Sequence, residues 1–180
     1  MLDPTRTILV VVDLQEKLLP AVAERERVLK NGILLLRLAR ALEIPVVLTS
    51  QYRKGLGSVV PEILAEAPGA EPLDKVVFGC FEHEPFRAAL EPMVRGQLLV
   101  CGIETHICVT QTVLGARERR YEVHVATDAV SSRTAENHRV GLARMEREGA
   151  VISSAEMAIY ELLQRSDSPA FKWMLPHLKG

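Results

Sequence analysis

The stretch that decides the fold runs from Gln97 to Thr112 and reads Q-L-L-V-C-G-I-E-T-H-I-C-V-T-Q-T. Its first five residues, Gln97–Cys101, are almost entirely apolar, which is typical of a strand buried on both faces of a parallel sheet. A tight turn follows, and the pattern after it predicts a helix over Thr105–Arg119 with Thr105 as its N-cap residue. Strand, turn and helix in this order predict one βα unit of a parallel sheet.

Short apolar runs alternate with amphipathic segments along the rest of the chain as well. Further strands are predicted at Thr7–Val12, Val46–Leu48, Asp74–Phe78, Glu122–Ala126 and Val151–Ser153, and further helices at Arg27–Leu42, Val59–Glu66, His83–Leu90, Ala135–Glu148 and Ala155–Leu163. Six strands with crossover helices predict a three-layer α/β/α domain with a six-stranded parallel sheet over residues 1–180. Ligands of such open sheets bind beyond the carboxyl ends of the strands.

Composition narrows the possible partners. A chain of 180 residues with 48% hydrophobic and 25% charged residues fits one folded domain. Lys and Arg total 22 against 23 Asp and Glu, so the net charge of -1 gives no broad field for nucleic acid or acidic membranes. No apolar run approaches the roughly 18 to 20 residues that span a bilayer, and the N-terminus does not resemble a signal peptide. We therefore expect a small-molecule substrate and neither a nucleic-acid nor a membrane partner.

The three cysteines, Cys80, Cys101 and Cys108, are odd in number and have no C-x-x-C spacing. This pattern predicts neither a disulfide framework nor a thiolate zinc site, and reduced thiols fit a cytoplasmic protein. The histidines also lack metal-ligand spacing. Cys80 and Cys101 stand within apolar runs, where a cysteine usually serves as a small hydrophobic residue.

Cys108 differs because it falls in the first turn of the predicted helix. There the helix dipole and unpaired amides lower the pKa of a thiol, which predicts a reactive nucleophile. The alternative is a cysteine that merely fills space. His106 is the nearest histidine, but residues two apart on a helix point in different directions, so His106 is a weak candidate for its base.

Two charged residues stand at the ends of predicted strands. Asp13 follows the first strand, where the crevice of a parallel sheet opens, although Asp13 and Glu16 also match a capping box at a helix start. Lys75 interrupts an apolar run, so it is either an exposed strand-end residue or a buried cation that needs a carboxylate. Spacing alone does not bring these two residues and Cys108 together.

Several motifs of the chain resemble those of a known protein family. The D-L-Q motif at Asp13, the lysine before V-V-F at Lys75 and G-I-E-T-H-I-C-V-T-Q-T at Gly102–Thr112 are similar to those of the isochorismatase-like cysteine hydrolases, which have a Rossmann-like fold. Tyr121–Arg133 and Gly149–Met157 match that family in the same order, so the resemblance covers nearly the whole chain. The stretch Q-Y-R-K-G-L-G-S, residues 51–58, further resembles the isochorismatase domain-containing proteins.

The resemblance implies a catalytic triad. Cys108 would be the nucleophile, Asp13 the general base and Lys75 the cation that holds both. A cis peptide bond between Ile103 and Glu104 would turn the backbone amides of Glu104 and Cys108 toward an oxyanion. The implied reaction is attack on an amide or related acyl carbon, a thioester intermediate and hydrolysis.

Departures from the family limit the substrate. Nicotinamidases carry a metal-binding Asp-x-His cluster after the second strand, whereas residues 49–52 here read T-S-Q-Y, so we expect no metal and no cofactor. Isochorismatases cleave a vinyl ether, which is the second candidate reaction. Candidate substrate-binding residues are Gln15, Tyr52, Phe78 and Glu104.

Other function classes stay open. A protein that keeps the fold for binding or assembly would have an unreactive Cys108. A redox sensor would need a resolving cysteine, and none is evident from the sequence. Family members commonly form homo-oligomers, and Pro169–Leu178 offers apolar surface for a neighbour or for the protein's own core.

Overall fold

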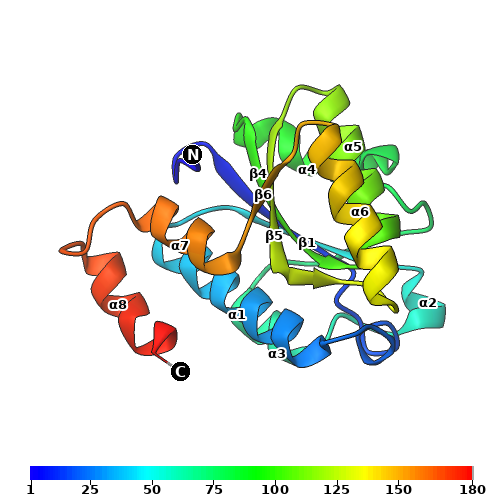
Figure 1. The fold of residues 1–180 in the computed structure, drawn as a ribbon, viewed down its shortest axis with the longest axis horizontal. Helices are drawn as coiled ribbons and strands as arrows, with labels where there is room; N and C mark the ends of the chain where they lie inside the picture. Colours follow the sequence, from blue (N-terminus) through cyan, green and yellow to red (C-terminus); the bar gives the residue numbers. More distant parts are fainter. Residues whose placement is uncertain (180) are drawn as a thin grey trace.

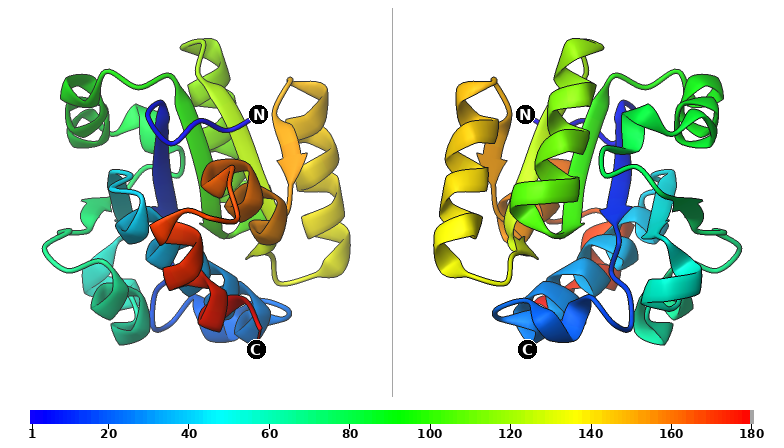
Figure 2. Two further views of the ribbon diagram at one scale, coloured as in Figure 1. Left: turned by 90° about the vertical axis from the view of Figure 1, so that its left-hand side faces the viewer. Right: turned by 90° about the vertical axis from the view of Figure 1, so that its right-hand side faces the viewer.

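The predicted six-stranded parallel sheet is confirmed by the computed structural model, which describes residues 1–179. The strand order is β3-β2-β1-β4-β5-β6, and every neighbouring pair is parallel. Figure 2 shows β1, β4, β5 and β6 following one another across the sheet. The strands are β1 (Thr7–Val12), β2 (Val46–Gln51), β3 (Leu73–Lys75), β4 (Gln97–Ile103), β5 (Glu122–Ser131) and β6 (Val151–Ser153).

Helices cover both faces of this sheet and complete the three layers (Figure 1). The helices are α1 (Arg25–Ala41), α2 (Arg53–Leu56), α3 (Pro61–Glu66), α4 (Glu84–Leu90), α5 (Thr110–Glu118), α6 (Ala135–Arg147), α7 (Ala155–Leu163) and α8 (Pro169–Leu178). Single turns stand at Leu19–Ala21, Cys80–Glu82, Glu91–Met93 and, in π-helical form, Thr105–Val109. Among the described residues, no helix has the length and apolarity needed to cross a membrane.

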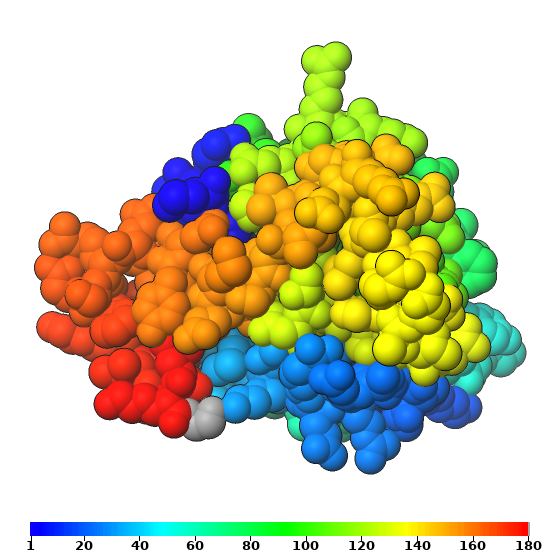
Figure 3. Space-filling model, in the orientation of Figure 1, coloured from blue at the N-terminus to red at the C-terminus, as the bar shows by residue number. Residues whose placement is uncertain are grey.

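The continuous apolar run of β1 arises because both of its faces are buried. Leu9 and Val11 pack with α1, α3, α7 and α8, whereas Ile8, Val10 and Val12 pack with α4, α5 and α6. The stretch Pro169–Leu178, for which two packing modes were open, forms α8 and places Met174 in the first of these cores. Figure 3 shows α8 at the periphery beside α1.

The direction in which successive strands are added to the sheet reverses between β1 and β4, although the two strands are parallel. Chain connections lead from β1 to β2 and β3 on one side and from β4 to β5 and β6 on the other, so a crevice opens between the carboxyl ends of β1 and β4. Asp13 follows β1 directly, and the π-helical turn with Cys108 follows β4. The topology therefore brings two of the predicted site residues to one place.

Several predicted boundaries were wrong at this edge. The strand predicted at Asp74–Phe78 ends at Lys75, because the following backbone bends and turns the carbonyls of Val76 and Val77 toward Gln51 and Lys75. β2, β4 and β5 run on past their predicted ends. For β5 the reason is that parallel pairing with β4 resumes after an irregularity and continues to Ser131.

Two predicted caps were also wrong. Asp13 does not begin a helix: its φ is 52°, and a bridge between Gln15 and Val59 follows. Thr105 is not an N-cap either, because the helix starts as a π-helical turn and the Thr105 hydroxyl contacts His138 instead. In both cases a polar side chain that matched a local capping pattern has a partner far away in the sequence.

Substitution of Gly102 would test how closely β4 approaches β1. A Cβ atom at Gly102 would lie 2.0 Å from the Val12 carbonyl oxygen, and its φ is +118°. Gly69 also has positive φ, +82°, but nothing lies within 4 Å of its Cβ position. We expect Gly102→Ala to yield no stably folded protein and Gly69→Ala to cost about 1 kcal/mol. Thermal and urea unfolding of both variants would check this, and equal stabilities would contradict the steric account.

Candidate active site

A buried ion pair stands at the centre of the site. Lys75 is the last residue of β3 and Asp13 the first after β1, and the Lys75 Nζ lies 2.7 Å from the Asp13 Oδ2. Both side chains are 0% exposed. Of the two interpretations of Lys75, the buried cation with a carboxylate partner is the observed one.

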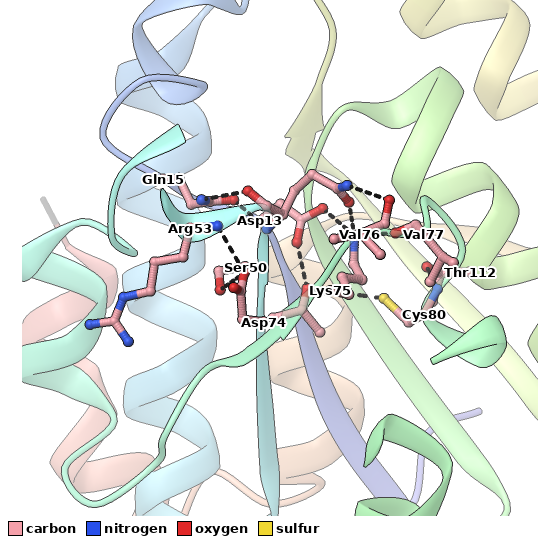
Figure 4. A network of polar contacts seen from close by, with 12 residues as sticks. Asp13, Gln15, Ser50, Arg53, Asp74, Lys75, Val76, Val77, Cys80 and Thr112 are labelled. Carbon is pink, nitrogen blue, oxygen red and sulfur yellow. Dashed lines mark hydrogen bonds and ion pairs between the residues drawn. The ribbon is translucent and has the colours of Figure 1, made fainter. Parts of the chain in front are cut away.

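Two residues of β2 complete the hydrogen bonds of this pair (Figure 4). The Thr49 hydroxyl donates to Asp13 Oδ1 at 2.7 Å, and Lys75 Nζ donates to Gln51 Oε1 at 2.7 Å. Lys75 Nζ also lies 3.4 Å from the Val77 carbonyl oxygen. Buried charges are tolerated only when their hydrogen-bonding capacity is used in this way, so β2 is as much part of the site as β1 and β3.

Gln15 holds Gln51 in place from the other side. The Gln51 amide donates to Gln15 Oε1 at 2.6 Å, while Gln15 Nε2 donates to the carbonyls of Gln51 and Gly57 at 3.1 and 2.8 Å. The Gln15 side chain thus uses both of its ends on backbone groups, and the residue is 0% exposed. Its predicted contact with substrate stays a prediction.

The charge state of Lys75 follows from two opposing effects. Burial is the largest single effect and lowers its pKa, but the interactions with Asp13, Cys80 and Cys108 together outweigh burial, and the pKa of Lys75 is raised above its ordinary value. Lys75 is therefore a cation at neutral pH.

Cys108 lies in the π-helical turn after β4 and is 6% exposed. The expectation of a lowered pKa was wrong: burial, then the charge of Asp13, raise the pKa of the Cys108 thiol to about 12. Lys75 acts in the opposite direction, and a hydrogen bond with Asp13 favours the protonated thiol. Burial beside a carboxylate outweighs the effect of the helix terminus. The site therefore contains a protonated thiol next to the Asp13 carboxylate.

The turn between β4 and Cys108 contains a cis peptide bond between Ile103 and Glu104. The Glu104 carboxylate accepts hydrogen bonds from the backbone amide and Nε of Arg133, at 3.0 and 3.1 Å, and its side chain is 11% exposed. Glu104 is thereby tied to the loop after β5. The predicted use of the Glu104 and Cys108 amides as oxyanion donors stays a prediction.

The two remaining candidate substrate-binding residues are about half exposed. Tyr52 and Phe78 are 51% and 53% exposed, on the segments that directly follow β2 and β3. Tyr52 is fixed to the site through its backbone, because its amide donates to the Lys75 carbonyl at 2.8 Å. Both side chains are available to a ligand at this edge of the sheet, and their predicted substrate contacts stay predictions.

The other two cysteines are fully buried, as their apolar surroundings predicted. Burial raises the pKa of Cys101 to about 12 and that of Cys80 to about 11. Cys80 is nevertheless connected to the site, since its Sγ lies 4.0 Å from the Thr49 hydroxyl (Figure 4). His106 contacts Ser132, with 2.9 Å between Nδ1 and Oγ.

Sequence reasoning missed Thr49 and Gln51 as site residues. The available signal was the polar T-S-Q at the end of an otherwise apolar strand, which matched no motif and was considered only as a departure from a metal site. Within residues 1–179, no group of three or more His, Cys, Asp and Glu side chains could hold a metal ion. Gln51 instead binds the Lys75 ammonium.

Comparison with known families fits this geometry. The model of the isochorismatase domain matches residues 7–157, which include all three candidate catalytic residues. The chain belongs to the isochorismatase domain family. The mouse isochorismatase domain-containing protein 2A is 38% identical over 174 residues, covering 94% of this chain and 81% of that protein. The secreted isochorismatase effector Isc1 of Phytophthora sojae is 39% identical over 175 residues, covering 95% and 83%.

Solved structures of family members show the same fold. The Caenorhabditis elegans MAR1 ribonuclease superposes with a TM-score of 0.94 at 34% identity, over 99% of this chain and 92% of that one. YcaC of Pseudomonas aeruginosa, solved with hexane-2,5-diol and covalent acrylamide, has a TM-score of 0.92 at 27% identity, covering 98% and 90%. The Escherichia coli YcaC gene product, described as an octameric hydrolase of unknown specificity, also has 0.92, at 26% identity, covering 98% and 89%.

The causes of the Cys108 pKa predict an order among variants. Asp13→Asn removes the raising effect of Asp13 and keeps the lowering effect of Lys75, whereas the double change Asp13→Asn with Lys75→Met leaves burial and the smaller raising effect of Cys80. We therefore expect the pKa of Cys108 to be lowest in Asp13→Asn, intermediate in the double variant and highest, at about 12, in the wild type.

Ultraviolet absorbance of the thiolate against pH would measure this, with Cys108→Ser subtracted to remove the other two thiols. A wild-type pKa below that of Asp13→Asn would contradict the proposed electrostatics.

Proposed function

We propose that this protein is a cysteine hydrolase that cleaves an amide or related acyl bond of a small molecule through Cys108, Asp13 and Lys75. The observation that carries the proposal is the fully buried Asp13–Lys75 pair, 2.7 Å apart, whose charges both act on the Cys108 thiol. An ion pair without solvent costs several kcal/mol per ion in desolvation, so a purely packing role would be better served by apolar residues.

The chemistry begins with a protonated thiol. As the Cys108 sulfur attacks the carbonyl carbon, its proton passes to the Asp13 carboxylate, and the carbonyl oxygen becomes an oxyanion. Asp13 then returns the proton to the leaving nitrogen, the carbon–nitrogen bond breaks and a thioester remains. A water that gives a proton to Asp13 attacks the thioester, the carbon–sulfur bond breaks, and Asp13 passes that proton to the departing Cys108 sulfur, which releases the acid product and restores the thiol and the carboxylate.

Lys75 keeps Asp13 available as a base. Burial of the Asp13 carboxylate carries a desolvation cost. The Lys75 cation offsets this cost, and Thr49 fixes the remaining carboxylate oxygen. The covalent acrylamide named for the P. aeruginosa relative supports an electrophile-reactive site in this family.

The ribonuclease name of the C. elegans relative raises a second possible substrate class. The charge of this chain favours a small molecule, since 22 basic against 23 acidic residues supply no general attraction for phosphates. Vinyl-ether cleavage remains the second candidate reaction for a small molecule, and a non-catalytic binding or scaffold role is the alternative to an enzyme. The enzymatic and the non-catalytic roles predict different results when Cys108 is replaced.

Assembly and location are further parts of the proposal. The octameric E. coli relative supports a homo-oligomer, which sedimentation would test. Three unpaired cysteines support a cytoplasmic protein, while the name of the P. sojae relative indicates that secretion occurs in the family. Fractionation of the source cells would decide between these.

Substitution of the three residues tests the mechanism. Cys108→Ser should abolish ammonia release from a panel of small aliphatic and aromatic amides, and Asp13→Asn should lower it roughly 10²- to 10⁴-fold because the base is lost. Lys75→Met should also inactivate the enzyme, with a loss of about 3 to 5 kcal/mol in unfolding free energy from the unpaired buried carboxylate. Cys101→Ser, at a buried cysteine whose pKa is shifted by burial alone, is the matched control and should retain activity.

Circular dichroism and thermal unfolding would establish that each variant is folded. Mass spectrometry of wild-type protein quenched during turnover should detect an acyl group on Cys108. Turnover by folded Cys108→Ser at the wild-type rate would overturn the covalent mechanism and favour vinyl-ether chemistry. Absence of any reaction with an unreactive Cys108 would favour the binding role, and RNA cleavage lost in the same variants would favour the nuclease.

A further inference from the structure

One segment outside the proposed triad contacts the nucleophile turn, defined as Glu104–Val109, at successive residues. This bracing segment is Ser132–Gly141, which links β5 to α6 and includes the first two turns of α6. Figure 1 shows α6 lying beside α5, into which the nucleophile turn leads. None of the residues of this segment takes part in the bond-making steps proposed above.

Polar contacts fix the first and third residues of the turn. Arg133 donates to Glu104 through its backbone amide and its Nε, at 3.0 and 3.1 Å. The Ser132 hydroxyl lies 2.9 Å from the His106 Nδ1. The side chains that flank Thr105 are therefore both held by the loop before α6.

Thr105 itself is held by α6. Its hydroxyl lies 2.9 Å from the Nδ1 of His138, and the residue is 0% exposed. Three residues further on, Gly141 brings α6 into direct contact with the turn, since a Cβ there would lie 3.0 Å from the His106 Cα. Residues three apart share a helix face, so His138 and Gly141 both face the nucleophile turn.

The backbone of Thr105 also connects to the helix that follows Cys108. The Thr105 carbonyl accepts a hydrogen bond from the Thr110 hydroxyl at 2.6 Å. A displacement of Thr105 would therefore move both sides of the turn, and Cys108 lies between them. Displacements on the order of 1 Å in a site can change rates by roughly 100-fold.

We propose that His138 is a positioning residue for the hydrolase: its Nδ1 fixes the Thr105 hydroxyl and so aligns the Glu104 and Cys108 amides with the reacting carbonyl oxygen. This inference rests on the proposed function, because it needs acyl transfer to Cys108. Burial, followed by the charge of Arg27, lowers the pKa of His138, which keeps the imidazole neutral near pH 7. A neutral imidazole has one acceptor nitrogen for a hydroxyl donor.

The test uses two reactions of the same thiol. Acylation by p-nitrophenyl acetate passes through an oxyanion, whereas alkylation by iodoacetamide is a displacement at a saturated carbon and develops none. The ratio of the two rate constants at Cys108 therefore measures the oxyanion donors, separately from access to the thiol. Cys108→Ser supplies the background of both reactions.

Variants at position 138 distinguish the two imidazole nitrogens. Asn places an amide group where Nδ1 stands and Gln places it nearer Nε2, so His138→Asn should keep the wild-type ratio and His138→Gln should lose it. We expect the ratio to fall roughly 10- to 100-fold in His138→Gln and in Thr105→Val. The double variant should be no worse than either single change, because both remove one contact. Arg139→Gln, at a neighbouring exposed position of α6, is the matched control.

The outcomes separate the two proposals. If the wild type and Cys108→Ser react equally with the ester, the proposed function fails, whatever His138 does. If wild-type Cys108 is acylated and His138→Gln and Thr105→Val keep its ratio, the function stands and the role of His138 is overturned. Equal loss in His138→Asn and His138→Gln, or equal slowing of both reactions, would also overturn it. Should His138→Gln not fold, Thr105→Val makes the same comparison.

Discussion

The structure depends on keeping one carboxylate and one ammonium group charged away from water. The Asp13–Lys75 pair is 0% exposed on both sides, so desolvation has to be offset by contacts inside the protein. Thr49 and Gln51 supply these contacts from β2, and Gln15 in turn holds Gln51. The ends of three neighbouring strands are thus fixed relative to one another by a single polar network, and the loops around the site begin from that fixed edge.

One of the three buried thiols differs from the other two in its surroundings. Burial raises the pKa of Cys80, Cys101 and Cys108 alike, to between about 11 and about 12, so acidity does not separate them. Cys108 is distinguished by its place in the π-helical turn after β4 and by its residual exposure, 6% against 0% for the other two. A protonated thiol resists unselective oxidation better than a thiolate does.

The sequence allowed the six parallel strands to be predicted, because strand burial is a local signal, and the motif resemblance supplied Asp13, Lys75 and Cys108 as candidate site residues. β1 and β4 are apolar on both faces, and each carries a conspicuous polar residue just beyond its end. Gln51 and His138 could not be found this way. Their partners, Lys75 and Thr105, lie 24 and 33 residues away, and only the folded chain brings them together. Asp13 and Thr105 were mistaken for caps for the same reason.

The position of Lys75 on the outermost strand has a consequence for thermal behaviour. β3 is a three-residue strand at the edge of the sheet and pairs only with β2. Short edge elements open at a lower free-energy cost than the sheet interior, in units smaller than the whole domain. Detachment of β3 would remove the cation from Asp13 while β1, β4 and β5 stay paired. Loss of the Asp13–Lys75 pair and global unfolding are consequently separate events in this fold, and amide hydrogen exchange at β3 reports the first of them.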